Sequence, residues 1–234
     1  MNIMIDNIEY KINNFDMNLL NNKANKICII GMTNTGKTTL ILNIVNKLKD
    51  IKYGSIITPT DRIDKTYNKY FKDGYIEYEY NSEILKKVLL RQKKLKEPNF
   101  LFIMDNCDCA KIKWTNDKNY DKLMKKDYNI TFIQTMQYSM GILHREYFDY
   151  IFITEADLIL NRKKIYEHYF SNIYETFEIF NKIFTKIMKD FRCIIIDTKN
   201  KLVYIYDIVK KNELIENTNM INIMEYGKII NILI

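Results

Sequence analysis

The chain has 234 residues, of which 47% are hydrophobic and 28% charged, with a formal net charge of +7. This composition excludes wholesale disorder, and the length suits one sizeable α/β core rather than two. No apolar run approaches the roughly 18–20 residues that a membrane span requires, and the first residues lack a basic stretch followed by an apolar one. We therefore expect an intracellular protein without a membrane segment.

Short apolar runs alternate with longer amphipathic stretches, which is typical of a mainly parallel sheet covered by helices. Helices are expected at 37–48, at 81–95 with Asn81 as N-cap, and at 161–190, where aromatic residues recur at steps of three and four and predict core packing. We expect one ATPase domain over residues 1–211 and a C-terminal tail of unknown role over 212–234. The expected strands are 26–30, 55–58, 75–80, 100–104, 130–134, 150–154, 193–197 and 202–206.

The strongest motif joins the first of these strands to the first helix. Residues 31–38 read Gly-Met-Thr-Asn-Thr-Gly-Lys-Thr, which fits the phosphate-binding loop at every fixed position. Glycines let successive backbone N–H groups point at phosphates, and the helix presents its positive end to the same anion. The motif predicts an α/β P-loop NTPase. The predicted nucleotide-binding residues are Gly31, Met32, Thr33, Asn34, Thr35, Gly36, Lys37, Thr38 and Thr39.

A Mg²⁺ site is expected beside this loop. Lys37 is expected to reach the β- and γ-phosphates, and the Thr38 hydroxyl to ligate the ion. Asp105 follows five apolar residues of a buried strand, so it is the expected acidic partner. The next residue is Asn106, where many such ATPases place a second acid, so Asn106 would orient a water by hydrogen bonding or Asp108 would substitute as the base.

Two residues further along are candidates for sensing and completing the site. Gln134 is expected to end the next strand, where its amide would sense the γ-phosphate, although a polar strand-end cap is an equal alternative. Arg145 precedes the strand at 150–154 and is a candidate arginine finger acting on a neighbouring subunit. Arg162 is the reserve candidate, and a surface salt bridge remains the alternative for either arginine.

The order of these motifs resembles that of the FtsK–HerA superfamily. The motifs are the phosphate loop, Asp105, Gln134, the Gln137-Tyr138 pair, Arg145 and Asp149. Within that superfamily, they are most similar to the poxvirus-type genome-packaging ATPases of large DNA viruses and virophages. The resemblance implies an ATP- and Mg²⁺-dependent motor that packages double-stranded DNA, independently of its sequence, into a capsid. It also implies a homo-oligomeric ring with an arginine supplied in trans, a capsid or portal partner, and a location in the host cytoplasm, viral factory or virion.

Other functions remain open at this point. A different DNA-directed ATPase fits the same motifs, and an assembly protein that binds ATP but scarcely hydrolyses it fits Asn106. A nucleotide kinase or a GTPase is disfavoured, because the sequence has no Arg-rich lid, no Asn-Lys-x-Asp motif and no Asp-x-x-Gly after a strand. The positive charge, and a helix carrying Lys86, Lys87, Arg91, Lys93, Lys94 and Lys96, favour contact with DNA phosphates, but such a face is also typical of a solvated helix.

Overall fold

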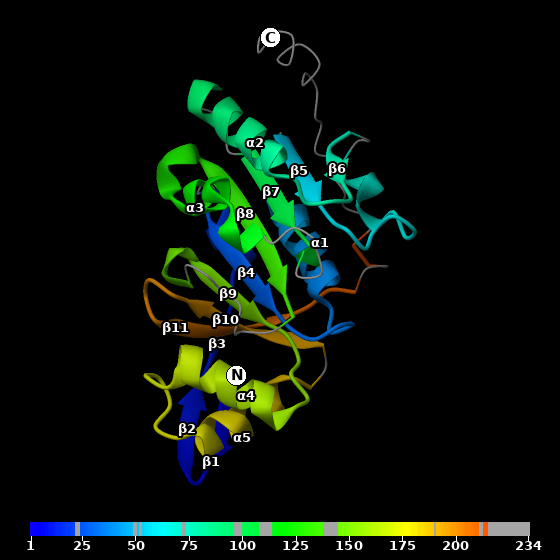
Figure 1. The fold of residues 1–234 in the computed structure, drawn as a ribbon. Coiled ribbons are helices and arrows are strands. Elements are labelled where there is room, and N and C mark those ends of the chain that lie inside the picture. The colour runs from blue at the N-terminus through cyan, green and yellow to red at the C-terminus, as the bar shows by residue number, and fades with distance from the viewer. Residues whose placement is uncertain are drawn as a thin grey trace.

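A computed structural model describes residues 1–21, 24–48, 51, 53–71, 74–95, 100–107, 114–137, 145–189, 191–210 and 213–214. Within these residues the protein is built on a nine-stranded sheet with the order β3-β11-β10-β9-β4-β8-β7-β5-β6 (Figure 1). The strands from β9 to β6 run parallel, whereas β10 is antiparallel to both β9 and β11. The mainly parallel α/β fold class expected from the sequence is confirmed.

The central strands are buried on both faces, which explains their continuous apolar runs. They are β4 (Lys26–Ile30), β5 (Tyr53–Ile57), β7 (Phe100–Met104), β8 (Ile130–Met136) and β9 (Tyr150–Ile153). β6 (Ile76–Glu77) is much shorter than the expected strand at 75–80. The other edge holds β10 (Arg192–Asp197), β11 (Leu202–Asp207) and the two-residue β3 (Asn13–Asn14).

Helices cover the two faces of the sheet unequally. α1 (Lys37–Lys47) packs on one face against the odd-numbered residues of β4, such as Ile27 and Ile29. α2 (Ser82–Leu95), α3 (Lys118–Met124) and α5 (Phe177–Ile187) pack on the opposite face, with Cys28 and Phe132 in their core. Side chains alternate between faces along a strand, so this division decides which residues can reach the loop before α1.

The helix expected at 161–190 is divided. α4 (Ile159–Ile165) continues into a π-helical turn at Tyr166–Phe170, and α5 begins afresh after Thr176. The Thr176 side chain accepts a hydrogen bond from the backbone N–H of Ile179, so it caps the new helix. The aromatic residues of this stretch do form core, as expected, with the rings of Phe170 and Phe180 at 4.7 Å.

An N-terminal hairpin was not expected from the sequence. β1 (Asn2–Ile5) and β2 (Ile8–Lys11) form a separate two-stranded sheet beside α5 (Figure 1). Its loop residue Asp6 forms an ion pair with Lys182 of α5 at 2.8 Å. The expected domain boundary at 211/212 lies outside the described residues.

Candidate functional site

The loop between β4 and α1 is fixed to the end of β9. The Thr35 and Thr154 hydroxyls are 2.7 Å apart, and Thr35 also donates to the carbonyl of Met32. At Gly31 there is no space for a side chain, because a Cβ would lie 1.7 Å from the Thr154 hydroxyl. Gly36 has a φ of 89°, the left-handed region that glycine adopts at little cost. Both glycines of the motif are thus explained by local geometry.

Lys37 lies across the loop at the start of α1. Its side chain is buried, and its ammonium donates to the carbonyls of Gly31 at 2.9 Å and Met32 at 2.7 Å. A positive charge therefore stands where the amino end of α1 also presents a positive dipole. The two effects together favour an anion at this loop.

Asp105, which directly follows β7, meets the loop through Thr38. The Thr38 hydroxyl donates to Asp105 Oδ2 at 3.0 Å. Asp105 is only 1% exposed, and this burial raises its carboxyl pKa, against the opposing effects of its hydroxyl donors and the Lys37 charge. A threonine hydroxyl beside a carboxylate is a set of hard oxygen donors that fits Mg²⁺.

Two further hydroxyls bind the same carboxylate, and sequence reasoning missed both. Tyr67 donates to Asp105 Oδ2 at 2.8 Å, and Thr135 donates to Oδ1 at 2.8 Å. Tyr67 belongs to a 3₁₀ turn, Thr66–Lys69, whose backbone N–H groups at Thr66 and Tyr67 donate to the Asp61 carboxylate. The pKa of Tyr67 is raised well above its ordinary value, mainly by burial and secondly by the nearby Asp105 charge.

Gln134 does not join this group. It lies one residue before Thr135 on β8, so its side chain points to the opposite face, where its Oε1 accepts a hydrogen bond from Tyr120 of α3 at 2.6 Å. The expected γ-phosphate sensor role is therefore not supported by its placement. β8 extends two residues beyond the expected end, so Gln137 follows the strand instead, next to Met136, whose carbonyl accepts from the Gly31 N–H at 3.0 Å.

A cavity of about 310 Å³ lies over the phosphate loop. Asn106 lies at this cavity and has a left-handed φ of 55°. Its backbone N–H donates to the Thr135 hydroxyl at 2.8 Å, and its side-chain amide donates to the Thr60 hydroxyl at 3.2 Å. Gly31, Met32 and Thr35, which were also predicted to bind the nucleotide, do not line this cavity; they hold the shape of the loop through their bonds to one another, to Lys37 and to Thr154. The cavity is lined by Thr33, Asn34, Gly36, Lys37, Thr38, Thr39, Asn106 and Phe191.

The two candidate arginines differ in what the structure describes. Arg145 begins a 3₁₀ turn, Arg145–Tyr147, ahead of β9, but its side chain lies outside the described residues, as do Asp108 and Tyr138. Arg162 is bonded within its own chain, to the Asn181 side chain and to the carbonyls of Ala156 and Asp157. Arg162 thus joins α4, α5 and the segment after β9, which does not favour a role on a neighbouring subunit.

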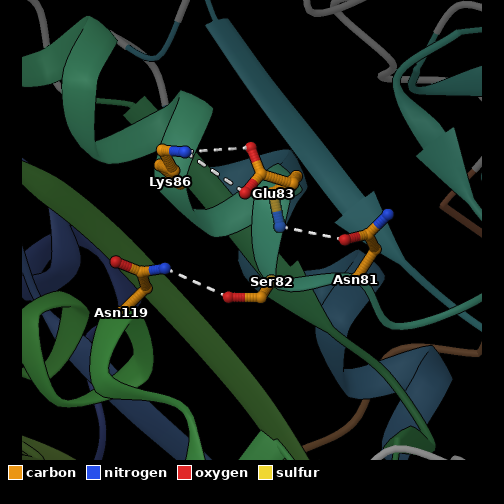
Figure 2. Close-up of polar contacts among 5 residues, drawn as sticks. All are labelled: Asn81, Ser82, Glu83, Lys86 and Asn119. Carbon is orange, nitrogen blue, oxygen red and sulfur yellow. Dashed lines mark hydrogen bonds and ion pairs between the residues drawn. The ribbon is translucent and has the colours of Figure 1, made fainter.

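The basic helix is less uniform than its sequence predicts. Arg91 is 3% exposed, with its guanidinium 4.5 Å from the ring centroid of Tyr53, so it belongs to the core. Figure 2 shows the start of α2, where Asn81 accepts from the N–H of Glu83 as the expected N-cap, and Lys86 pairs with Glu83. Lys87, Lys93 and Lys94 are exposed, whereas Lys96 lies outside the described residues.

α2 is also tied to α3 in this region. The Asn119 amide donates to the Ser82 hydroxyl at 3.1 Å (Figure 2). α3 begins at the cap Asp117, which accepts both from the N–H of Asn119 and from the hydroxyl of Tyr80. These bonds join α2 to α3 on the face of the sheet opposite α1, and none of them involves the phosphate loop.

Comparison with solved structures places this fold among the P-loop NTPases. The genome packaging NTPase B204 from Sulfolobus turreted icosahedral virus 2, solved in complex with AMPPCP, superposes with a TM-score of 0.57 at 15% identity, covering 80% of this chain and 98% of that one. The likeness confirms the expected α/β P-loop NTPase fold.

Comparison of sequences adds relatives from large DNA viruses. The uncharacterized protein 075L of Invertebrate iridescent virus 6 is 31% identical over 212 residues, which cover 83% of this chain and 81% of that protein. The uncharacterized protein L437 of Acanthamoeba polyphaga mimivirus is 28% identical over 218 residues, covering 86% and 76%. This chain belongs to the viral protein family that includes 075L. No protein-family model matches it.

Among the helices that the structure describes, none is both long enough and apolar enough to span a bilayer.

Proposed function

We propose that this protein is an ATP-hydrolysing motor that moves double-stranded DNA into a viral capsid. The observation that carries the proposal is the contact between the phosphate loop and the buried acid, in which Thr38 bonds Asp105 at 3.0 Å beside the Lys37 ammonium. This arrangement supplies an anion site and a magnesium site side by side. The fold shared with the packaging NTPase B204 supports the choice of a motor over other P-loop proteins.

In the proposed complex, the triphosphate lies in the cavity over the loop. Lys37 exchanges its two carbonyl acceptors for β- and γ-phosphate oxygens, and the backbone N–H groups of residues 33–38 bind the remaining oxygens. The Thr38 hydroxyl and the Asp105 carboxylate would hold Mg²⁺. The ion would neutralise charge that develops on the transferred phosphoryl group. Tyr67 and Thr135 keep the Asp105 carboxylate oriented toward the magnesium site.

Water activation is assigned to the end of the cavity beside β7 and β8. Asn106 lines the cavity and orients the attacking water through its amide, since it cannot act as a carboxylate base. Gln137 replaces Gln134 as the proposed γ-phosphate sensor, because it follows β8 next to the loop. Arg145 is the proposed arginine finger, supplied across the interface of a homo-oligomeric ring.

The DNA contacts of such a motor should go to phosphates and be independent of base sequence. The net charge of +7 and the exposed lysines of α2, including Lys87, Lys93 and Lys94, support a polyanionic partner. We place the working protein in the cytoplasm or viral factory of an infected host, with a capsid or portal component as a further partner. Residues 1–211 form the proposed ATPase domain.

The test is ATP turnover by the purified chain with and without double-stranded DNA of several sequences, with Lys37→Ala as the blank. We expect turnover that rises several-fold with any duplex and disappears in the variant, because the phosphate loop loses its cation. Turnover retained by Lys37→Ala would refute the site. Stimulation by single strands alone would favour a different DNA-directed ATPase.

Asn106 supports a second candidate, an assembly protein that binds ATP and scarcely hydrolyses it. The residue after the metal-binding acid carries no charge, and both its backbone N–H and its amide are bonded, to Thr135 and Thr60. The same experiment separates the two candidates, since tight ATP binding without turnover, in the presence or absence of duplex DNA, would favour the assembly protein.

A further inference from the structure

A second and larger cavity adjoins the phosphate cavity. It measures about 510 Å³, which lies within the usual range for small-molecule sites. The segment after β9 and the last turns of α5 line it, including Glu155, Asp157, Thr185 and Met188. Phe191, the residue before β10, lines both cavities, so the two spaces meet at its side chain.

Phe191 has two features that an ordinary surface phenylalanine lacks. Its φ is 60°, a left-handed conformation that is a genuine outlier for a bulky residue. Its side chain is held at the phosphate loop, since a Cβ built on Gly36 would lie 2.9 Å from Phe191 Cζ. Phe191 nevertheless remains 40% exposed, so an aromatic surface is available at the junction of the cavities.

The sheet order gives the phosphate cavity a direction. Asn106 and Asp105 follow β7, on one side of the phosphate loop, whereas Phe191 precedes β10, on the other side, because the order is β10-β9-β4-β8-β7. If the metal-binding acid marks the γ-phosphate end, the α-phosphate end lies toward Phe191. The nucleoside must then leave the phosphate cavity beside Phe191, where the second cavity begins.

We propose that the second cavity binds the nucleoside half of the nucleotide, with the base stacked on Phe191. Met188 contributes apolar surface, and the exposed carboxylates of Glu155 and Asp157 accept hydrogen bonds from the ribose hydroxyls. Every base has a π-face, so an aromatic ring can bind it by stacking alone. This inference rests on the proposed function, since it extends the same triphosphate site.

The test compares two ligands by calorimetry in the presence of Mg²⁺: ATP, which has a nucleoside, and inorganic tripolyphosphate, which has none. Phe191→Leu removes the ring and keeps an apolar side chain, and Phe191→Tyr is the matched control that retains the ring. Thr185→Trp, at an exposed position of α5 that lines only the second cavity, fills that cavity without touching the phosphate loop.

We expect Phe191→Leu to bind ATP roughly ten-fold more weakly, the loss of one stacking contact. Its affinity for tripolyphosphate should equal that of the wild type, and Thr185→Trp should show the same selective loss, whereas Phe191→Tyr should bind both ligands normally. Equal losses for both ligands would show that Phe191 only supports the phosphate loop, and unchanged ATP affinity in both Phe191→Leu and Thr185→Trp would place the nucleoside elsewhere. Either result would overturn the inference.

A wild-type chain that binds neither ligand would instead refute the phosphate site itself, and this inference with it. Wild-type binding of tripolyphosphate, combined with equal ATP affinity in all variants, would leave the phosphate site intact and refute only the nucleoside cavity.

Discussion

The two faces of the sheet use buried polar residues differently, and neighbouring residues of β8 show the difference. On the α1 face, Thr135 belongs to a group in which three hydroxyls bind the Asp105 carboxylate. On the other face, Gln134 bonds Tyr120 inside an apolar core. A buried charge must be compensated by several donors, whereas a neutral amide is satisfied with fewer. Chemistry is therefore expected on the face where donors converge.

Among the variants that compare the two faces, the largest effect is expected from Thr135→Val, which keeps the shape of the side chain and removes its hydroxyl. Asp105 loses one donor, and the N–H of Asn106 loses its acceptor. Because loss of a group that orients a metal ligand typically reduces activity 10–100-fold, we expect ATP turnover to fall roughly 100-fold. Steady-state turnover at saturating ATP would measure it. A variant with wild-type turnover would show that Thr135 has only a structural role.

Tyr67→Phe should have a smaller effect, because it removes one hydrogen bond to Asp105 and leaves the ring in place. We expect turnover to fall roughly ten-fold and the Mg²⁺ concentration at half-maximal turnover to rise. The free energy of unfolding should fall by about 1.5–3 kcal/mol, the usual value for a bond to a charged group. Urea denaturation provides the second measurement. Lower stability with an unchanged Mg²⁺ dependence would contradict the positioning role.

Gln134→Leu should have the smallest effect on function and serves as the control for the other face. Within the described residues, its amide nitrogen is buried without a hydrogen-bond partner, so a leucine removes one unsatisfied group while it deprives Tyr120 of its acceptor. The free energy of unfolding should change by about 1 kcal/mol or less, with ATP turnover unchanged. A turnover loss comparable to that of Thr135→Val would restore Gln134 as a sensor and break the distinction between the faces.

Much of the fold could be predicted because parallel strands buried on both faces appear as separate apolar runs. β4 and β7 begin and end at the predicted residues, and Asp105 follows its strand as expected. The N-terminal hairpin was missed because its short strands alternate weakly and depend on packing against α5. The division between α4 and α5 was missed because continuous helical spacing masked the cap at Thr176.

Within the site, the prediction that most changed the assignment of residues was the end of β8, which lies two residues later than expected. Ending β8 at Gln134 placed that residue at the loop, whereas the strand continues through Thr135 and Met136, and each step of one residue reverses the face. The β-branched Thr135 was the available signal. Tyr67 offered none, because it reaches Asp105 from a loop 38 residues earlier in the chain.

The sequence by itself determined the phosphate loop, the buried strand that leads into it and the acid that follows another buried strand, because these depend on local spacing. Only the tertiary structure decided that Tyr67 and Thr135 bind that acid, that Gln134 faces away, and that Phe191 joins two cavities. These contacts bring together residues distant in the chain or select between the faces of one strand, and the order and register of strands in the sheet fix both.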